Sequence, residues 1–386
     1  MKRSPRVAIM STMLMGNRDV SRLRVTGISP MTVVAGAFAL TAISAILSAL
    51  LGANADRMLG ISGAVLGVTT FGLSQWQTKG PRARRVVMVP KSRSPFSASV
   101  HRGLADALHE YSGISMSVEW PAAPVPDEVA WQLRVLRSPN VIRADGVVIV
   151  PAADDERLWL ELVRFSRAGG FVVVLDTKPT NAFFAGRSAP RPCFVGSDFS
   201  AGGDLVGIEL VDRLSADPDL RAVVALGPVW SFPGSERSRA IAHWISLNGA
   251  RERVFFLELK TWDKIVAAKA IGEAVMEQLR YDSAGKVSKV VAFCGNDKIL
   301  ASVDQVLRRL LSADHCDRVS LIGYDGAVGT DGSLMAGEYL RAVATIDTQP
   351  TEQGVVAAEL LIDEHRGLLA GRASRYIAPR IVRFGS

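Results

Sequence analysis

The polar side chains that stand out in this sequence are suited to binding a polar ligand rather than to catalysis. Asp176, Asn296 and Asp325 each follow closely on a short apolar run that is typical of a β-strand. Carboxylates accept hydrogen bonds, and amides both accept and donate them, so these side chains match a ligand that carries hydroxyl groups. In open α/β sheets, ligands bind beyond the carboxyl ends of the strands, where these residues are expected. The pattern therefore predicts a binding site for a small polar molecule.

Motifs for catalysis, cofactors and metals are missing from the sequence. It contains no GxSxG elbow, no phosphate-binding P-loop and no glycine-rich dinucleotide fingerprint after a strand. The histidines lack metal-ligand spacing and the cysteines form no CxxC pair. The histidines are His101, His109, His243, His315 and His365, and the cysteines are Cys193, Cys294 and Cys316. We therefore expect no enzyme, no cofactor and no metal, and three ordinary buried thiols.

Alternating strand and helix patterns predict an α/β fold with parallel sheets. After Arg85, short β-branched runs alternate with stretches that have apolar residues at i, i+3 and i+4, which is typical of βαβ units. The predicted strands are Val86–Val89, Gly146–Val150, Phe171–Leu175, Ala222–Leu226, Val254–Leu257, Lys289–Phe293 and Val319–Tyr324. The predicted helices are Val100–Tyr111, Glu156–Ala168, Ala201–Leu214, Arg237–Asn248, Trp262–Arg280, Lys298–Ser312 and Gln353–Leu369. Ser200 and Asp297 are expected to cap the helices that start beside them.

A series of segments resembles the type I periplasmic binding proteins of the ribose and galactose group, which share their fold with lactose-repressor-like effector domains. The resemblance covers residues 85–386. The segments are VVMVPKSRSPFSASVHRGLADAL, ADGVVIVPA with GGFVVVLDTKP, FVGSDFSAGGDLVGIELVDRL, GSERSRAIAHWI, FCGNDKILASVDQVL, VSLIGYDG and VATIDTQPTEQG. The resemblance implies two doubly wound parallel-sheet lobes joined by a hinge of three crossovers.

The resemblance also implies which side chains contact the ligand. Phe96 would stack on the apolar face of a sugar ring, and Arg237 would provide several donors to its hydroxyls. The expected ligand-binding residues are Ser94, Phe96, Asp176, Arg237, Asn296, Asp325, Thr348 and Gln349. Thr348 stands where many pentose binders have glutamine, so the ligand is expected to differ from the usual pentose.

The same reasoning sets the expected domain boundaries. A basic tail covers residues 1–30, a two-helix membrane anchor covers 31–76 and a basic linker covers 77–85. The first lobe is expected at 86–194 plus 349–372, and the second lobe at 195–348 plus 373–386. The hinge is expected near Cys193–Ser197, Thr348–Pro350 and Gly371–Tyr376.

Two uncharged apolar runs near the amino terminus predict a transmembrane hairpin. Met31–Ala53 is long enough to cross a hydrocarbon layer of roughly 30 Å as a helix, and Met58–Trp76 is weaker but of similar length. Residues 1–93 carry thirteen Lys and Arg against two acidic residues, so the basic excess surrounds these runs and suits an anionic membrane surface. An alternative is a secretory signal that is cleaved at Ala53–Ala55.

The expected location is the bacterial inner membrane, with the side of the soluble part left open. Basic residues flank the hairpin on both sides, which favours a cytoplasmic soluble part by the positive-inside rule. The family resemblance instead favours a periplasmic or extracellular one.

Together these observations favour a membrane-anchored receptor that closes its lobes on a small polar ligand, with a sugar as the expected class. Its partners would be the membrane and an ABC permease or a sensor protein. One alternative is a cytoplasmic sensor derived from a transcription regulator, because Asp19–Arg22 and Gly27–Val33 resemble a repressor helix-turn-helix. Two extra residues in the turn and an uncharged second helix argue against nucleic acid as a partner. Another is an interaction module that has lost ligand binding.

Overall fold

The computed structural model describes residues 83–122, 125–178, 191–228, 231–280, 289–326, 342–369 and 373–384. The predicted hairpin at residues 31–76, the basic tail at 1–30 and the segment similar to a helix-turn-helix lie outside these ranges and stay predictions. Of the expected basic linker at 77–85, only residues 83–85 are described, and Arg84 and Arg85 begin the first strand of the fold. Among the described residues, no helix is both long and apolar enough to cross a membrane.

The first lobe is built on a six-stranded sheet in which every paired strand is parallel. The strand order is β11-β5-β4-β3-β1-β2. The strands are β1 (Arg84–Val89), β2 (Ile114–Val118), β3 (Gly146–Ile149), β4 (Phe171–Leu175), β5 (Cys193–Ser197) and β11 (Ser374–Ile377). Because the strands are parallel, their carboxyl ends meet at one edge of the sheet.

The second lobe repeats this plan with one antiparallel edge strand. Its order is β12-β10-β9-β8-β6-β7, and β12 runs antiparallel to β10. The strands are β6 (Leu220–Leu226), β7 (Val254–Glu258), β8 (Lys289–Phe293), β9 (Val319–Tyr324), β10 (Ala342–Asp347) and β12 (Arg380–Arg383).

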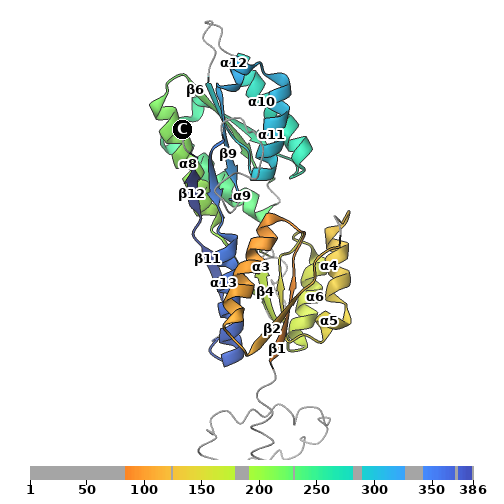
Figure 1. Cartoon of the computed structure of the whole chain (residues 1–386). Coiled ribbons are helices and arrows are strands. Elements are labelled where there is room, and N and C mark those ends of the chain that lie inside the picture. The colour runs from red at the N-terminus through yellow and green to blue at the C-terminus, as the bar shows by residue number, and fades with distance from the viewer. Residues whose placement is uncertain are drawn as a thin grey trace, which may run out of the picture. The chain divides into compact units, whose positions relative to one another are not determined.

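Helices cover both faces of each sheet (Figure 1). The helices of the first lobe are α3 (Pro95–His109), α4 (Glu128–Leu136), α5 (Pro139–Ile142), α6 (Glu156–Arg167) and α13 (Pro350–Arg366). Those of the second lobe are α8 (Phe199–Ala216), α9 (Phe232–Leu247), α10 (Lys264–Arg280), α11 (Asp297–Leu310) and α12 (Ala313–Cys316), with a 3₁₀ turn at Arg251–Arg253.

Double coverage explains why the central strands are continuously apolar. In β1, Val86 and Met88 pack on the face under α3 and α13, while Val87 and Val89 pack on the face under α4 and α6. Alternate residues point to opposite faces, so a strand buried on both sides needs an apolar residue at every position.

The polypeptide passes between the lobes three times, at Asp198, at Thr348–Gln349 and at Ala378–Pro379. The crossovers are tied to one another by hydrogen bonds. The Asp198 backbone N–H donates to the Ile377 carbonyl at 2.9 Å, and the Gln349 side chain donates to the Ala378 carbonyl. β5 and β11 belong entirely to the first sheet, so the first and third crossovers come a few residues later than the expected boundaries at 194 and 372.

The two-lobed α/β architecture is confirmed, and all of the predicted strands and helices are present with ends that differ by a few residues. The sequence interpretation missed β2, β5, β10, β11, β12 and α4. The expected cap at Ser200 is wrong: Asp198 caps α8, its Oδ1 accepting from the Ala201 backbone N–H at 3.0 Å.

Candidate ligand-binding site

The first lobe contributes Lys91, Phe96 and Asp176 to one cluster. Lys91 follows β1 and Asp176 follows β4, so both lie at the carboxyl edge of the sheet. The Lys91 Nζ lies 3.0 Å from Asp176 Oδ2 and 5.4 Å from the centre of the Phe96 ring. Asp176 has a φ of 64°, and its backbone N–H donates to the Val195 carbonyl at 3.0 Å. The backbone thus holds the carboxylate in a left-handed conformation that few non-glycine residues adopt.

The Lys91 ammonium is held in its charged form. Burial would lower its pKa, but the attraction of Asp176, aided by more distant Asp325 and Glu128, outweighs burial and raises the pKa. Lys91 therefore carries a full positive charge at neutral pH. The sequence interpretation placed Lys91 after a strand but did not include it among the ligand contacts.

Ser94 has a structural role in this lobe. It is the N-cap of α3, where its Oγ accepts from the Ser97 backbone N–H at 3.2 Å, and its side chain is buried. Its hydroxyl also donates to Ser97 Oγ at 3.2 Å. The Ser94 side chain, which was expected to contact the ligand, thus caps the helix that carries Phe96.

Arg237 is the central cation of the second lobe. Only 6% of it is exposed, and its guanidinium carbon lies 4.1 Å from the Tyr324 ring centre and 5.2 Å from that of Trp262. Its Nη1 donates to the Gly295 carbonyl at 2.9 Å, and its Nε donates to the Pro233 carbonyl at 3.1 Å. Two rings and two carbonyls therefore fix the guanidinium at the carboxyl ends of β8 and β9.

Trp262 is a site residue that the sequence interpretation missed. Its ring packs against three glycines, where an added Cβ would lie 2.7 Å (Gly227), 3.2 Å (Gly234) and 3.1 Å (Gly295) from ring atoms. Small residues at these positions let the half-buried indole lie over the ends of β6 and β8. Its place after β7 was the available signal.

Asn296, and not Asp297, caps α11. Asn296 is the N-cap of α11, its Oδ1 accepting from the Ile299 backbone N–H at 2.8 Å, so its amide N–H groups and the second lone pair of Oδ1 are left to face a ligand. Asp297 is buried and accepts from Thr345 Oγ1 at 2.8 Å. The expectation that Asp297 caps the helix is therefore wrong.

Asp325 connects the two lobes electrostatically. It follows β9 with a φ of 96°, and its backbone N–H donates to the Ile346 carbonyl at 2.9 Å. Its pKa is raised to about 6, mainly by burial and also by the Asp176 carboxylate, while Arg237, Lys91 and Lys298 oppose the rise. Asp176 and Lys91 belong to the first lobe, so the site residues of both lobes lie within electrostatic range of one another.

Thr348 and Gln349 belong to a crossover. Thr348 is 2% exposed, its Oγ1 donates to the Asp325 carbonyl at 3.4 Å, and its own carbonyl accepts from Gln353 at 2.8 Å. Gln349 has a φ of 53°, and its backbone N–H donates to Asp347 Oδ1 at 2.8 Å. In the described part of the chain, Thr348 and Gln349, both predicted to contact the ligand, make hydrogen bonds that hold the crossover beside Asp325.

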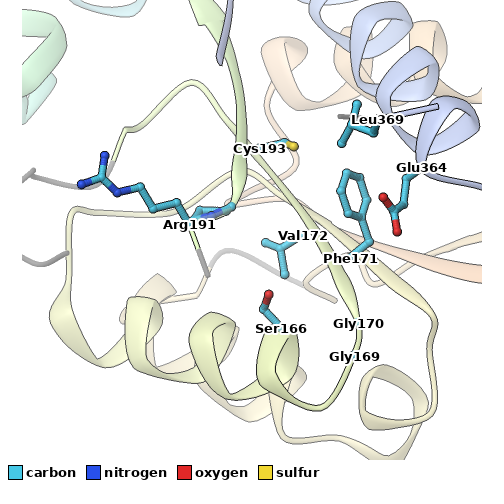
Figure 2. A pocket seen from close by; sticks show the side chains of 10 residues that line it. Ser166, Gly169, Gly170, Phe171, Val172, Arg191, Cys193, Glu364 and Leu369 are labelled. Atoms are coloured by element: carbon cyan, nitrogen blue, oxygen red, sulfur yellow. The ribbon is translucent and has the colours of Figure 1, made fainter. Parts of the chain in front are cut away.

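A cavity of about 310 Å³ lies elsewhere, at the amino ends of β4 and β5. Figure 2 shows Phe171, Cys193, Leu369 and Glu364 gathered on one side of it, while Arg191 points away from them. This is the edge of the first sheet opposite to Lys91 and Asp176. The cavity is therefore not the predicted site. No group of three metal-binding side chains occurs among the residues that the structure describes.

No protein-family model and no curated protein matches the chain. Solved structures do match. A periplasmic solute-binding protein of an ABC transporter from Actinobacillus succinogenes, with bound D-allose, has a TM-score of 0.59 and 16% identity over 78% of this chain and 97% of its own. A periplasmic ribose ABC transporter protein from Conexibacter woesei has a TM-score of 0.58 and 16% identity over 79% and 94%.

A third structure is a solute-binding protein from Mycobacterium smegmatis with bound glycerol, with a TM-score of 0.57 and 20% identity over 78% of this chain and 94% of its own. The chain has the type I periplasmic binding protein fold. Two of these structural neighbours are described as solute-binding proteins, and the third as a periplasmic ribose ABC transporter.

Proposed function

We propose that the protein is a receptor that closes its two lobes on a small polar ligand of the sugar type. The observation that carries the proposal is the buried Arg237 guanidinium, held between the Tyr324 and Trp262 rings at the carboxyl ends of β8 and β9. A ring and a carboxylate from one lobe, with a fixed guanidinium from the other, match a ligand that has an apolar face and a rim of hydroxyls. The sugar-binding structural neighbours support the same class.

Lobe closure would couple binding to a signal. A ligand that contacts both lobes favours the closed state by its differential affinity for that state. Three short crossovers tied by hydrogen bonds provide a hinge where a few backbone angles can change while both lobes stay rigid.

The membrane part of the proposal rests on the sequence alone. The apolar runs at residues 31–76 would anchor the receptor in a bacterial inner membrane, where closure would serve an ABC-type permease or a sensor partner. The two roles require opposite sides of the membrane, and labelling of single-cysteine variants of the full chain in intact cells distinguishes them. Transport requires labelling from outside the inner membrane, whereas internal sensing requires protection.

Thermal unfolding of the purified full-length protein with a panel of pentoses, hexoses and polyols tests ligand binding. A ligand at a hundred times its Kd stabilises the folded state by about 2.7 kcal/mol, a rise in Tm of a few degrees. We expect Arg237→Lys to abolish the rise because lysine cannot reproduce the planar donors. Arg239→Lys is the matched control, since Arg239 lies on the same helix with 72% of its side chain exposed. No rise with any member of the panel would contradict the proposal.

A further inference from the structure

The ring and the carboxylate that the first lobe offers to a ligand are both in contact with a lysine of the same lobe. The Lys91 Nζ lies over the Phe96 ring, 5.4 Å from its centre, and 3.0 Å from Asp176 Oδ2. The proposed function assigns this ring and this carboxylate to the ligand. One ammonium therefore stands on the surface that a ligand needs, and the whole arrangement lies within one lobe.

Phe96 can offer only part of its surface to a ligand. The half-buried ring packs against the apolar core beneath α3 and α13. An ammonium does not enter such a core because its charge would lose the water around it. The Lys91 ammonium thus lies on the part of the ring that the core leaves uncovered. A sugar that stacks its apolar face on Phe96 meets Lys91 at the same place.

Asp176 is held in place and needs a partner. Its φ is 64°, and its backbone N–H donates to the Val195 carbonyl at 3.0 Å, so the backbone fixes where the carboxylate points. Only 18% of the side chain is exposed. A carboxylate so shielded from water requires a hydrogen-bond donor, and Lys91 provides it. Sugar hydroxyls are donors too, so a ligand can take the place of the ammonium.

Lys91 is held less firmly than the cation of the second lobe. Arg237 is 6% exposed and is fixed by two rings and two backbone carbonyls. By contrast, 30% of the Lys91 side chain is exposed, and in the described part of the chain its ammonium makes one hydrogen bond, to Asp176. A lysine side chain is a flexible stem of four carbons with a strongly hydrated end. Lys91 can therefore leave the ring and the carboxylate for solvent, while Arg237 stays in place.

We propose that Lys91 is an internal competitor of the ligand, whose ammonium covers Phe96 and Asp176 until a sugar displaces it into solvent. This inference rests on the receptor function proposed above and adds a control of affinity to the same site. Displacing a partly exposed cation–π contact and a partly exposed ion pair lowers the affinity about tenfold, which is about 1.4 kcal/mol. Lys91 thus sets how tightly the sugar is bound.

Calorimetric titration of full-length variants with the same panel of pentoses, hexoses and polyols, D-ribose and D-allose included, tests the inference. Lys91→Ala removes the competitor, and we expect it to bind a sugar of the panel about tenfold more tightly than the wild type does. Lys91→Arg keeps a cation that can reach the same ring and carboxylate, so it should stay near the wild-type affinity.

Lys178→Ala is the matched control. Lys178 follows the same strand as Asp176, and its Nζ lies 5.4 Å from the centre of the Tyr376 ring and 2.7 Å from the hydroxyl of that ring. The control therefore removes a second lysine that contacts an aromatic ring of the first lobe, and leaves Phe96 covered. It should keep the wild-type affinity.

A second measurement follows Lys91 directly and does not depend on the folding of Lys91→Ala. Reductive methylation with ¹³C-formaldehyde labels the lysines of the full-length protein for NMR, and the signal that is missing from Lys91→Arg belongs to Lys91. Methyl groups above an aromatic ring resonate upfield of methyl groups in solvent. The Lys91 signal should start upfield and move to the position of exposed lysines at a saturating concentration of sugar.

The outcomes separate this inference from the receptor function. Equal or weaker binding by Lys91→Ala, or a Lys91 signal that stays upfield with sugar bound, overturns the inference and leaves the receptor function standing. An equal gain in Lys178→Ala assigns the effect to the loss of charge and also overturns it. Binding by Lys91→Ala and none by the wild type confirms the competitor but contradicts the receptor function for these sugars. Absence of binding by both proteins overturns both proposals.

Discussion

Asp325→Asn should stabilise the protein at neutral pH, because the Asp325 carboxylate is ionised there at a cost. Its pKa is raised from an ordinary 3.8 to about 6, mainly by burial. Asparagine keeps the shape of the side chain without the charge. It also tolerates the positive φ of 96° at this position better than most residues.

The sign and size follow from proton linkage. The folded protein binds the Asp325 proton more tightly than the unfolded chain, so the free energy of unfolding falls as pH rises from about 4 to above 6. The difference of about two pKa units corresponds to about 3 kcal/mol. Below about pH 4 the carboxyl is protonated in both states and the cost is absent.

Urea unfolding of the full-length wild type and Asp325→Asn between pH 4 and pH 8, followed by tryptophan fluorescence, measures this cost. We expect nearly equal stability near pH 4 and an advantage of the variant that grows to about 3 kcal/mol at pH 7.5. Taking the difference between the two proteins removes the titration of all other groups. Asp106→Asn, at an exposed acid on α3, should give a flat difference. A flat difference for Asp325→Asn as well would refute the assignment of an elevated pKa.

Further variants at two positions, with one control, test the packing of α13 on α3 and the role of the α11 cap. Gly354→Ala should destabilise the first lobe by about 1–3 kcal/mol in urea unfolding, because its Cβ would collide with the Val100 backbone carbonyl between α13 and α3. Gly272→Ala, whose Cβ would meet side-chain atoms of Val306 and Leu307 and no backbone atom within 4 Å, should cost clearly less, and equal costs would contradict the close helix contact. Asn296→Ala should lose about 1 kcal/mol with the α11 cap, whereas Asn296→Asp should keep the cap and bind ligand more weakly, as calorimetry can show. Unchanged ligand binding by Asn296→Asp would restrict Asn296 to a structural role.

The sequence by itself determined the central strands. It also showed which polar side chains follow the carboxyl ends of these strands, where a ligand-binding site is expected. Strands such as β3 and β4 are buried on both faces, so their apolar runs stand out from the helices beside them, and β9 shows the same pattern interrupted only by Ser320 and Gly323. Asp176 and Asp325 could be placed because each follows such a run. The membrane hairpin remains a prediction from the sequence.

The missed strands share a weaker local signal. The strands β2, β11 and β12 lie at sheet edges and are partly exposed, so their polar residues interrupt the apolar pattern. β5 ends in Val195-Gly196-Ser197, which has the composition of a turn. Their pairing with distant strands decides that they are strands, and pairing across the chain cannot be deduced from local composition.

Only the tertiary structure decided which polar residues stabilise the fold and which belong to the candidate binding site. Asn296 and Asp297 are adjacent and both can cap a helix, and the buried Thr345 hydroxyl on β10 assigns Asp297 to the core and leaves the cap to Asn296. Lys91 became a site residue because its long side chain reaches Asp176, which directly follows β4 and lies 85 residues away in the sequence. Such assignments depend on distances between elements that are remote in sequence, and folding alone brings those elements together.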